Sequence, residues 1–268
     1  MRLTIIIPVY NEAAFLRRCL DSITLRDDVQ IVIVDDASTD GSFDLEFEYQ
    51  SRTKGNVRLA SMAKRSGVSH ARNEGIKYSA GEFVTFLDAD DALRPDAVDN
   101  MLKAIGRNPD ENVIQLNHYR CTTDGCKPLP RFWARAGFYD LAHLPPKWAT
   151  VWNKIYRKAF LDEHGIRFPE GQQFDEDRRF NIECLRYTRG IKCSELTALC
   201  KYFDNDASLC HTMDADKIAG AIYGLTDMLR TETSPEIAEV IRQSIIRHLN
   251  SKKYYEIFGG RLKKGGDA

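Results

Sequence analysis

Three carboxylates directly follow one apolar segment. Phe83 to Leu87 contains β-branched, aromatic and aliphatic residues and leads into Asp88, Asp90 and Asp91. A buried parallel strand of this kind delivers its acids to the carboxyl edge of the sheet, where open α/β sheets bind ligands. Because clustered carboxylates repel one another and are costly to desolvate, we expect a cation there, and oxygen ligands favour Mg²⁺ or Mn²⁺. The alternative is a solvated turn that caps the following helix.

A second segment offers groups for an anion. Gly67 precedes an expected helix whose first turn holds His70 and Arg72, and backbone N–H groups at a helix start suit phosphate. The sequence lacks Gly-x-Gly-x-x-Gly and a Walker A loop, so any phosphate must be held by metal, Arg or Lys. Taken alone, Arg72 also fits an ordinary surface ion pair.

Length and composition narrow the class of protein. The 268 residues include 38 Lys and Arg against 39 Asp and Glu, and this balance predicts no nucleic-acid partner. The seven cysteines are scattered without a C-x-x-C pair, which favours reduced thiols, although Cys121 and Cys126 flank a hairpin-like turn and could approach each other. The absence of a long apolar run predicts a soluble, cytoplasmic protein.

The N-terminal part alternates strand and helix patterns. This alternation predicts a parallel sheet with right-handed crossovers. Strands are expected at 3–9, 29–34, 57–60 and 83–87, and helices at 11–23 and 69–79. Three of these strands end in polar clusters, which should therefore meet at one edge.

The pattern changes after residue 110. We expect a strand at 113–119 with a return through Phe132 and Trp133, and helices at 152–163, 175–187 and 216–230. Ser234 and Pro235 predict the start of another helix, with serine as N-cap and proline at the first position. The predicted division is a donor-binding half at 1–110, an acceptor-binding half at 111–212 and a helical extension at 213–268.

Four ordered motifs resemble the family-2 glycosyltransferases of the GT-A fold. They are Thr4 to Glu12, Val34 to Ser42, Gly67 to Gly75 and Phe86 to Asp91. The resemblance implies a Rossmann-like α/β domain with a mostly parallel sheet flanked by helices. It also implies metal-dependent, inverting transfer of a sugar from a nucleotide-diphosphate sugar, most often UDP-linked, to a hydroxyl of a glycan or lipid-linked glycan in cell-surface polysaccharide synthesis.

The resemblance further implies roles for individual residues. The donor nucleotide would be held by Pro8, Tyr10, Glu12, Asp36, Arg72, Asp88 and Ala89. Within this set, Asp36 would accept a hydrogen bond from the base, Arg72 would contact the base or the phosphates, and Asp88 would face the ribose. Asp90 would bind Mn²⁺ or Mg²⁺, Asp91 would support the metal or the donor sugar, and His211 is the candidate for a further metal ligand. Arg65 stands where many relatives carry Asn.

The acceptor side of the family resembles residues 151–177 here, and Asp177 matches the catalytic base. Sugar transfer with inversion needs a carboxylate that takes the proton of the acceptor hydroxyl. Asp175 and Glu176 are expected to raise the pKa of this base. Without the resemblance, an acidic first helical turn favoured by the helix dipole is the preferred interpretation of Asp177.

Other residues allow two interpretations each. Lys154 could pair with the diphosphate or the acids, or be a solvated surface residue. Trp148 and Trp152 could stack on an acceptor sugar or pack in the core. Basic residues interleave with apolar ones from Arg242 to Lys264, a pattern that allows peripheral membrane contact or a helix packed on the domain.

Two other functions compete with sugar transfer. A sugar-1-phosphate nucleotidyltransferase would carry a glycine-rich loop after the first strand, which Pro8 to Glu12 is not. A non-catalytic relative that only binds nucleotide or glycan would be expected to lack one of Asp88, Asp90 and Asp177.

Overall fold

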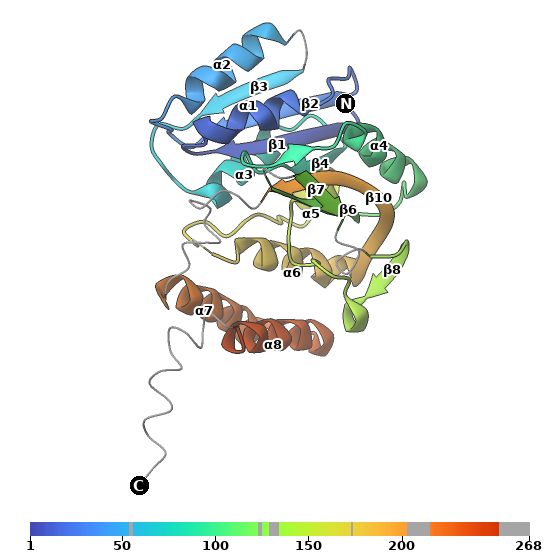
Figure 1. Ribbon diagram of the computed structural model, residues 1–268. Helices are drawn as coiled ribbons and strands as arrows, with labels where there is room; N and C mark the ends of the chain where they lie inside the picture. The colour runs from blue at the N-terminus through green and yellow to red at the C-terminus, as the bar shows by residue number, and fades with distance from the viewer. Residues whose placement is uncertain (54–55, 123–124, 129–133, 173, 203–214, 252–268) are drawn as a thin grey trace.

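The computed structural model describes residues 1–53, 56–122, 125–128, 134–172, 174–202 and 215–251. In these residues, helices flank a single mixed sheet of ten strands, and two C-terminal helices pack below it (Figure 1). The main path of the sheet runs β3-β2-β1-β4-β9-β6-β10-β5. The predicted α/β class with a helical C-terminal extension is confirmed.

The first half of the sheet is parallel, as predicted. Its strands are β1 (Leu3–Val9), β2 (Val29–Asp35), β3 (Val57–Ser61) and β4 (Phe83–Phe86), and its helices are α1 (Ala13–Asp21), α2 (Ser42–Arg52), α3 (Val68–Tyr78) and α4 (Ala97–Arg107). β1 pairs in parallel with both β2 and β4. Along β1, Ile5 and Ile7 enter one core and Ile6 enters the other, because alternate residues of a strand face opposite sides.

The second half continues the same sheet with mixed pairing. Its strands are β5 (Ala92–Leu93), β6 (Val113–Thr122), β7 (Gly125–Pro128), β8 (Gly137–Asp140), β9 (Lys154–Arg157) and β10 (Gly190–Tyr202). β9 lies antiparallel between β4 and β6, and β6 pairs in parallel with β10. The two predicted halves therefore share one continuous sheet, while their boundaries near residues 110 and 212 stay a prediction.

One expectation for this half was wrong, and one strand was missed. The segment 152–163 is not one helix but β9 followed by α5 (Lys158–Glu163). Ile155 and Tyr156 are fully buried, and a short apolar run fits a buried strand as well as a helix. β10 was not predicted at all, because its register shifts between Cys193 and Leu199 interrupt the alternation of apolar and polar residues.

The helices of the C-terminal part agree with their predictions. They are α6 (Glu176–Thr188), α7 (Ala215–Thr231) and α8 (Pro235–Leu249), with the 3₁₀ turn η2 (Leu141–His143) preceding them. The Ser234 hydroxyl accepts from the N–H of Ile237, and Pro235 begins α8. Leu225 and Ile241 enter the same core as Phe86, so α7 and α8 pack on the α/β domain.

The cysteine prediction needs one correction. Cys121 and Cys126 form a disulfide across the β6–β7 hairpin, where they are directly paired residues of the two strands. Directly opposite residues of antiparallel strands lie close enough for this bond, so the expectation of reduced thiols was wrong for this pair. Free, buried thiols are found at Cys19, Cys184, Cys193 and Cys200. Cys210, Phe132 and Trp133 lie outside the described residues.

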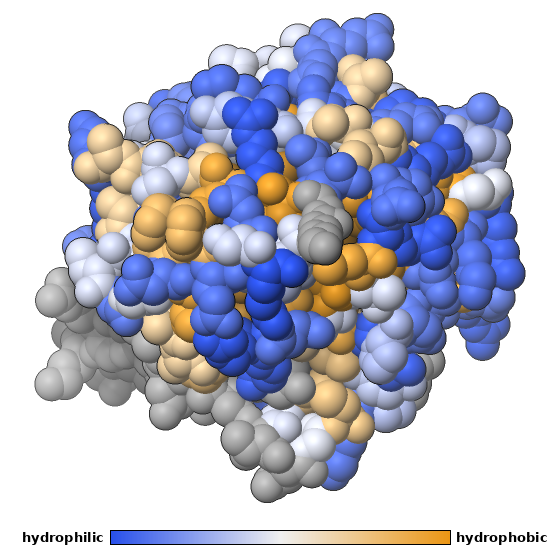
Figure 2. Space-filling view, turned by 90° about the horizontal axis from the view of Figure 1, so that it is seen from above, coloured by the Kyte–Doolittle hydropathy of each residue, from blue (hydrophilic) through white to orange (hydrophobic). Residues whose placement is uncertain are grey.

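The described surface is mainly hydrophilic when viewed from above, and the most apolar residues gather mainly near the middle of that view (Figure 2). No described helix has the length and apolar character required to cross a bilayer.

Gly75 permits the close contact between α3 and β1. A Cβ at this position would lie 2.2 Å from Cγ2 of Ile6, which is fully buried. We expect Gly75→Ala to lower the free energy of unfolding by about 1–3 kcal/mol through overpacking. Urea denaturation would measure the change.

Gly106 is the matched control, since it also lies in a helix and a Cβ there would have no heavy atom within 4 Å. Gly106→Ala should leave stability unchanged or raise it by about 0.5–1 kcal/mol. Equal effects of the two substitutions would contradict the close-packing argument.

Candidate active site

The acids after β4 lie together at the carboxyl edge of the sheet. One carboxylate oxygen from each of Asp88, Asp90 and Asp91 lies within 4.8 Å of the others. Asp91 is fully buried, whereas Asp88 and Asp90 are half-buried. The interpretation as a solvated turn does not fit this burial.

Arg72 joins this cluster to the second half of the chain. Its Nη1 donates to Glu176 Oε1 and Asp177 Oδ1, both at 2.9 Å, and its Nη2 donates to Asp88 Oδ1 at 3.1 Å. Only 5% of the Arg72 side chain is exposed, so it is not a surface ion-pair partner. Lys201 and Arg72 hold the pKa of Asp88 well below its usual range despite burial.

The start of α3 explains how Arg72 reaches the site. Both carboxylate oxygens of Asp36 accept backbone N–H groups, from Ser66 at 2.6 Å and from Gly67 at 2.7 Å. Gly67 has φ +95°, a conformation that glycine adopts without steric cost. Asp36 therefore anchors the helix start. His70 pairs instead with Glu170, with 3.2 Å between His70 Nδ1 and Glu170 Oε2.

Asp177 lies in the first turn of α6. Burial raises the pKa of Asp177 to about 7; Arg72 opposes this shift, while Glu176 and Asp88 add to it. The N–H of Val151 donates to Asp177 Oδ2 at 3.2 Å. Asp175, the other expected neighbour, binds Arg178 Nε and His248 Nε2 instead.

Lys201 was not anticipated as a site residue. It stands near the end of β10, and its Nζ lies 2.9 Å from Asp88 Oδ2 and 2.7 Å from Asp91 Oδ2. The ammonium group also lies 5.6 Å from the centroid of the Trp152 ring. A lysine that ends a strand at this sheet edge is the signal that sequence reasoning could have used, but β10 itself was missing from the prediction.

The cluster suits a divalent cation as well as Lys201. Five carboxylates, two of them on α6, gather around the cations of Arg72 and Lys201. An excess of buried negative charge favours a bound cation, and oxygen-only donors fit Mg²⁺ or Mn²⁺. Asp88, Asp90 and Asp91 could together offer carboxylate oxygens to such an ion. His211 lies outside the described residues.

The loop after β1 borders the same edge. Pro8 lies in β1, and the guanidinium of Arg65 stacks 4.1 Å from the ring centroid of Tyr10. Burial raises the pKa of Glu12 to about 7, and the nearby Asp90 and Asp88 add to this shift. Ala89 is buried between the acids. The structure thus brings the ends of β1, β2 and β4 together, as the sequence predicted.

Lys154 stabilises the loop that precedes β9, beside this site. It is fully buried, and its Nζ donates to the carbonyls of Lys147 and Thr150 and to Asn153 Oδ1. The expectation of a solvated surface lysine was wrong, and burial lowers the pKa of Lys154 to about 7. These bonds hold the loop whose Val151 N–H contacts Asp177.

Trp148 and Trp152 are both about nine-tenths buried. Trp152 belongs to the core around β1 and stacks edge-on against His118, with ring centroids 4.7 Å apart. Trp148 belongs to the other core and also lines a cavity beside α8. Core packing therefore accounts for Trp152, and Trp148 both packs and faces a cavity.

A family model described as "Glycosyl transferase family 2" matches residues 4–170, which include β1 to β4 and all three acids. The chain belongs to glycosyl transferase family 2. This family member is similar to the poly(ribitol-phosphate) beta-glucosyltransferase of Bacillus spizizenii, with 27% identity over 72% of this chain and 31% of that one. It spans 31% to 62% of the lengths of three curated relatives that it matches.

Solved structures support the fold of this family member. The structure of Staphylococcus aureus TarS 1–349 in complex with UDP-GlcNAc superposes with a TM-score of 0.81 and 21% identity, covering 98% of this chain and 76% of that one. The mannosyltransferase PcManGT from Pyrobaculum calidifontis, in complex with GDP-Man and Mn²⁺, gives a TM-score of 0.65 with 18% identity, covering 93% and 70%.

Lys201→Met tests the charge balance of the cluster. The substitution leaves Asp88 and the buried Asp91 without their ammonium partner, which should lower the free energy of unfolding by about 3–5 kcal/mol at pH 8. Burial already raises the pKa of Asp91 to about 7, and loss of Lys201 raises it further. Protonation at low pH removes the uncompensated charge, so the loss of stability should shrink as the pH falls to about 5.5.

Urea denaturation at both pH values measures the effect. Lys192→Met, on the same strand, is the control and should change stability by less than about 0.5 kcal/mol at either pH. A Lys201→Met loss that is independent of pH would contradict the role of Lys201 as counter-charge.

Proposed function

We propose that this chain transfers a sugar from a nucleotide-diphosphate sugar to a hydroxyl of a glycan or lipid-linked glycan. The expected donor is a UDP-sugar, and the transfer would proceed with inversion at the anomeric carbon. The observation that carries the proposal is the single guanidinium of Arg72, which binds both Asp88 of the donor half and Asp177 of the acceptor half. The UDP-GlcNAc complex of TarS supports this kind of donor.

The donor would lie along the ends of β1, β2 and β4. The base and ribose would be held by Pro8, Tyr10, Glu12, Asp36, Asp88 and Ala89, with Arg72 toward the base or the diphosphate. Asp36 uses one lone pair of each oxygen on the backbone, so its carboxylate can still accept an N–H from a base such as uracil.

Asp90 would hold Mn²⁺ or Mg²⁺, and the bound ion would offset the negative charge of the leaving diphosphate. The PcManGT complex, which contains Mn²⁺, supports a divalent ion in this fold. Lys201 would keep Asp88 and Asp91 neutralised beside it. His211 stays a candidate for a further ligand.

Asp177 would act as the general base. The acceptor hydroxyl oxygen attacks the anomeric carbon, its proton passes to a carboxylate oxygen of Asp177, and the bond from the anomeric carbon to the diphosphate breaks. Proton transfer to a positioned base contributes about 10²–10⁴-fold to such a rate. A pKa near 7 lets Asp177 accept the proton at neutral pH.

The acceptor is proposed to belong to a cell-surface polysaccharide. The poly(ribitol-phosphate) transferases among the relatives support this class. A lipid-linked acceptor would bring the chain to the cytoplasmic face of the membrane. Arg242 and Arg247 of the basic C-terminal segment are exposed on α8, whereas its residues from 252 onward lie outside the described part.

Hydrolysis of UDP-, GDP- and dTDP-sugars with and without Mn²⁺ tests donor and metal together. We expect slow, metal-dependent release of one nucleotide, abolished in Asp90→Ala. Asp177→Asn should bind the same nucleotide within about threefold in calorimetry, yet lose about 10²–10⁴-fold in transfer to acceptor.

Asp96→Ala is the control, since this exposed carboxylate lies outside the cluster and pairs with Arg94. It should hydrolyse the donor as the wild type does. Binding without hydrolysis at any metal concentration would indicate a non-catalytic relative, and no nucleotide binding would overturn the proposed function.

The pH dependence follows from Asp177. Because the base is active only when deprotonated, kcat/KM for the acceptor should rise about tenfold per pH unit below pH 7 and level off above it. The residual activity of Asp177→Asn should lack this rise. A wild-type rate that falls as the pH increases from 6 to 8 would exclude Asp177 as the base.

A further inference from the structure

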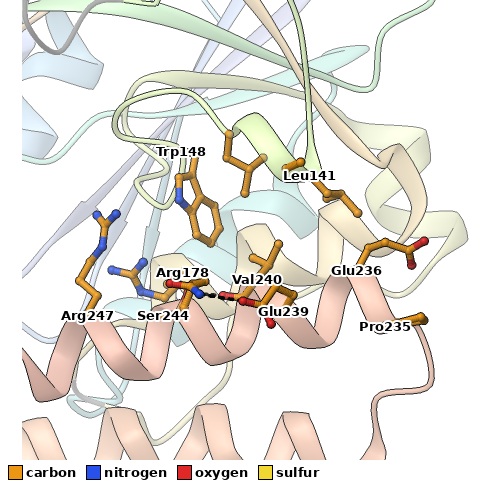
Figure 3. A pocket seen from close by; sticks show the side chains of 12 residues that line it. Leu141, Trp148, Arg178, Pro235, Glu236, Glu239, Val240, Ser244 and Arg247 are labelled. Carbon is orange, nitrogen blue, oxygen red and sulfur yellow. Dashed lines mark hydrogen bonds between the residues drawn. The ribbon is translucent and has the colours of Figure 1, made fainter.

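A cavity of about 750 Å³ lies beside α8, away from the acids described above. α8 forms one wall, and η2 with the loop that carries Trp148 forms the other (Figure 3). Its volume is in the range of sites for small organic ligands. Its volume exceeds that of two other cavities among the described residues, of about 80 and 540 Å³, and its walls carry both apolar and charged side chains.

The positive charge of this cavity is gathered at one end. Arg178 and Arg247 lie together there, and Glu236 lies at the opposite end (Figure 3). Glu236 pairs with Arg189, and Glu239 pairs with Arg242, so each acid of the lining has its own cation. Within the described part of the chain, no carboxylate lies within ion-pair distance of Arg247.

Arg178 is nine-tenths buried but incompletely bonded. Its Nε donates to both oxygens of Asp175, at 3.0 and 2.9 Å, while its Nη1 finds no acceptor in the described structure. A buried guanidinium N–H without an acceptor is unfavourable. Arg178 lines this end of the cavity, so an anion there would lie beside its guanidinium, and Arg247 would add a second positive charge.

The rest of the lining suits the body of a carbohydrate. The Trp148 ring points toward α8 (Figure 3), and Leu141, Leu144 and Val240 add apolar surface around it. A flat indole face suits the C–H-rich surface of a sugar or polyol. The cavity therefore matches a ligand that is part carbohydrate and part anion, rather than a purely apolar one.

The cavity is also connected to the candidate base. Asp177 and Arg178 are consecutive on α6, so their side chains diverge by about 100° around the helix. Asp177 thus faces the acid cluster, and Arg178 faces the cavity. The loop that presents Trp148 to the cavity also donates the Val151 N–H to Asp177.

We propose that this cavity binds an anionic segment of the glycan acceptor, with a phosphate or carboxylate group on Arg178 and Arg247 and a sugar or polyol unit against Trp148. The assignment as acceptor rests on the proposed function. The cavity would anchor an extended chain while another unit of that chain presents its hydroxyl to Asp177.

Calorimetric titration of the full chain, without nucleotide sugar, tests the proposal. The probes are a polyol-phosphate oligomer, a hexuronic acid oligomer and a neutral oligosaccharide of equal length. We expect at least one anionic oligomer to bind at least tenfold more tightly than the neutral one. Arg247→Gln should weaken that binding about tenfold, because it removes a charge-assisted contact on an exposed residue that folding does not need.

Arg230→Gln is the matched control: the residue is exposed on α7 and carries the same charge, but it lies outside the lining. It should bind as the wild type does, and thermal melting should be the same for both variants. Equal binding of neutral and anionic oligomers, or equal losses in the two variants, would overturn the proposal.

Vesicles with and without phosphatidylglycerol separate a lipid surface from a glycan. Capture by anionic vesicles that depends on Arg247, without binding of either anionic oligomer, would overturn the proposal in favour of a lipid surface. Since the titration contains no donor, oligomer binding without donor hydrolysis would support the cavity and contradict the proposed function. Donor hydrolysis without oligomer binding would support the proposed function and contradict the binding of an anionic glycan in the cavity.

Discussion

The structure depends on one buried guanidinium. Arg72 binds three carboxylates, and two of these lie more than 100 positions away in the sequence. Burying an ion is costly unless its partners surround it in good geometry. α3, the turn after β4 and the start of α6 therefore stabilise one another, and together they bring the two halves of the chain to one point.

Much of this arrangement is predictable from local sequence. The alternation of strands and helices dictates a parallel sheet, and a parallel sheet sends the ends of β1, β2 and β4 to the same edge. For that reason the segments that carry Glu12, Asp36 and Asp88 follow strands that end at the same edge. The N-cap of α8 at Ser234 was equally predictable, because a cap is a local interaction.

What could not be predicted depends on distant pairing. Lys201 contacts Asp88 across 113 positions, and its role exists only because β10 joins the sheet beside β5. Lys154 looked like a surface residue because nothing near it in sequence reveals that β9 is buried between two strands. The Cys121–Cys126 bond is local, but whole-chain cysteine usage pointed the other way.

The sharing of Arg72 has a consequence for how substitutions combine. Asp88, Glu176 and Asp177 share one positive charge. Removing any one of these carboxylates therefore strengthens the ion pairs between Arg72 and the other two. Their effects on stability will therefore not add, and the order in which substitutions accumulate will decide which are tolerated. A carboxylate of this trio can be lost at little cost in one sequence background and at great cost in another.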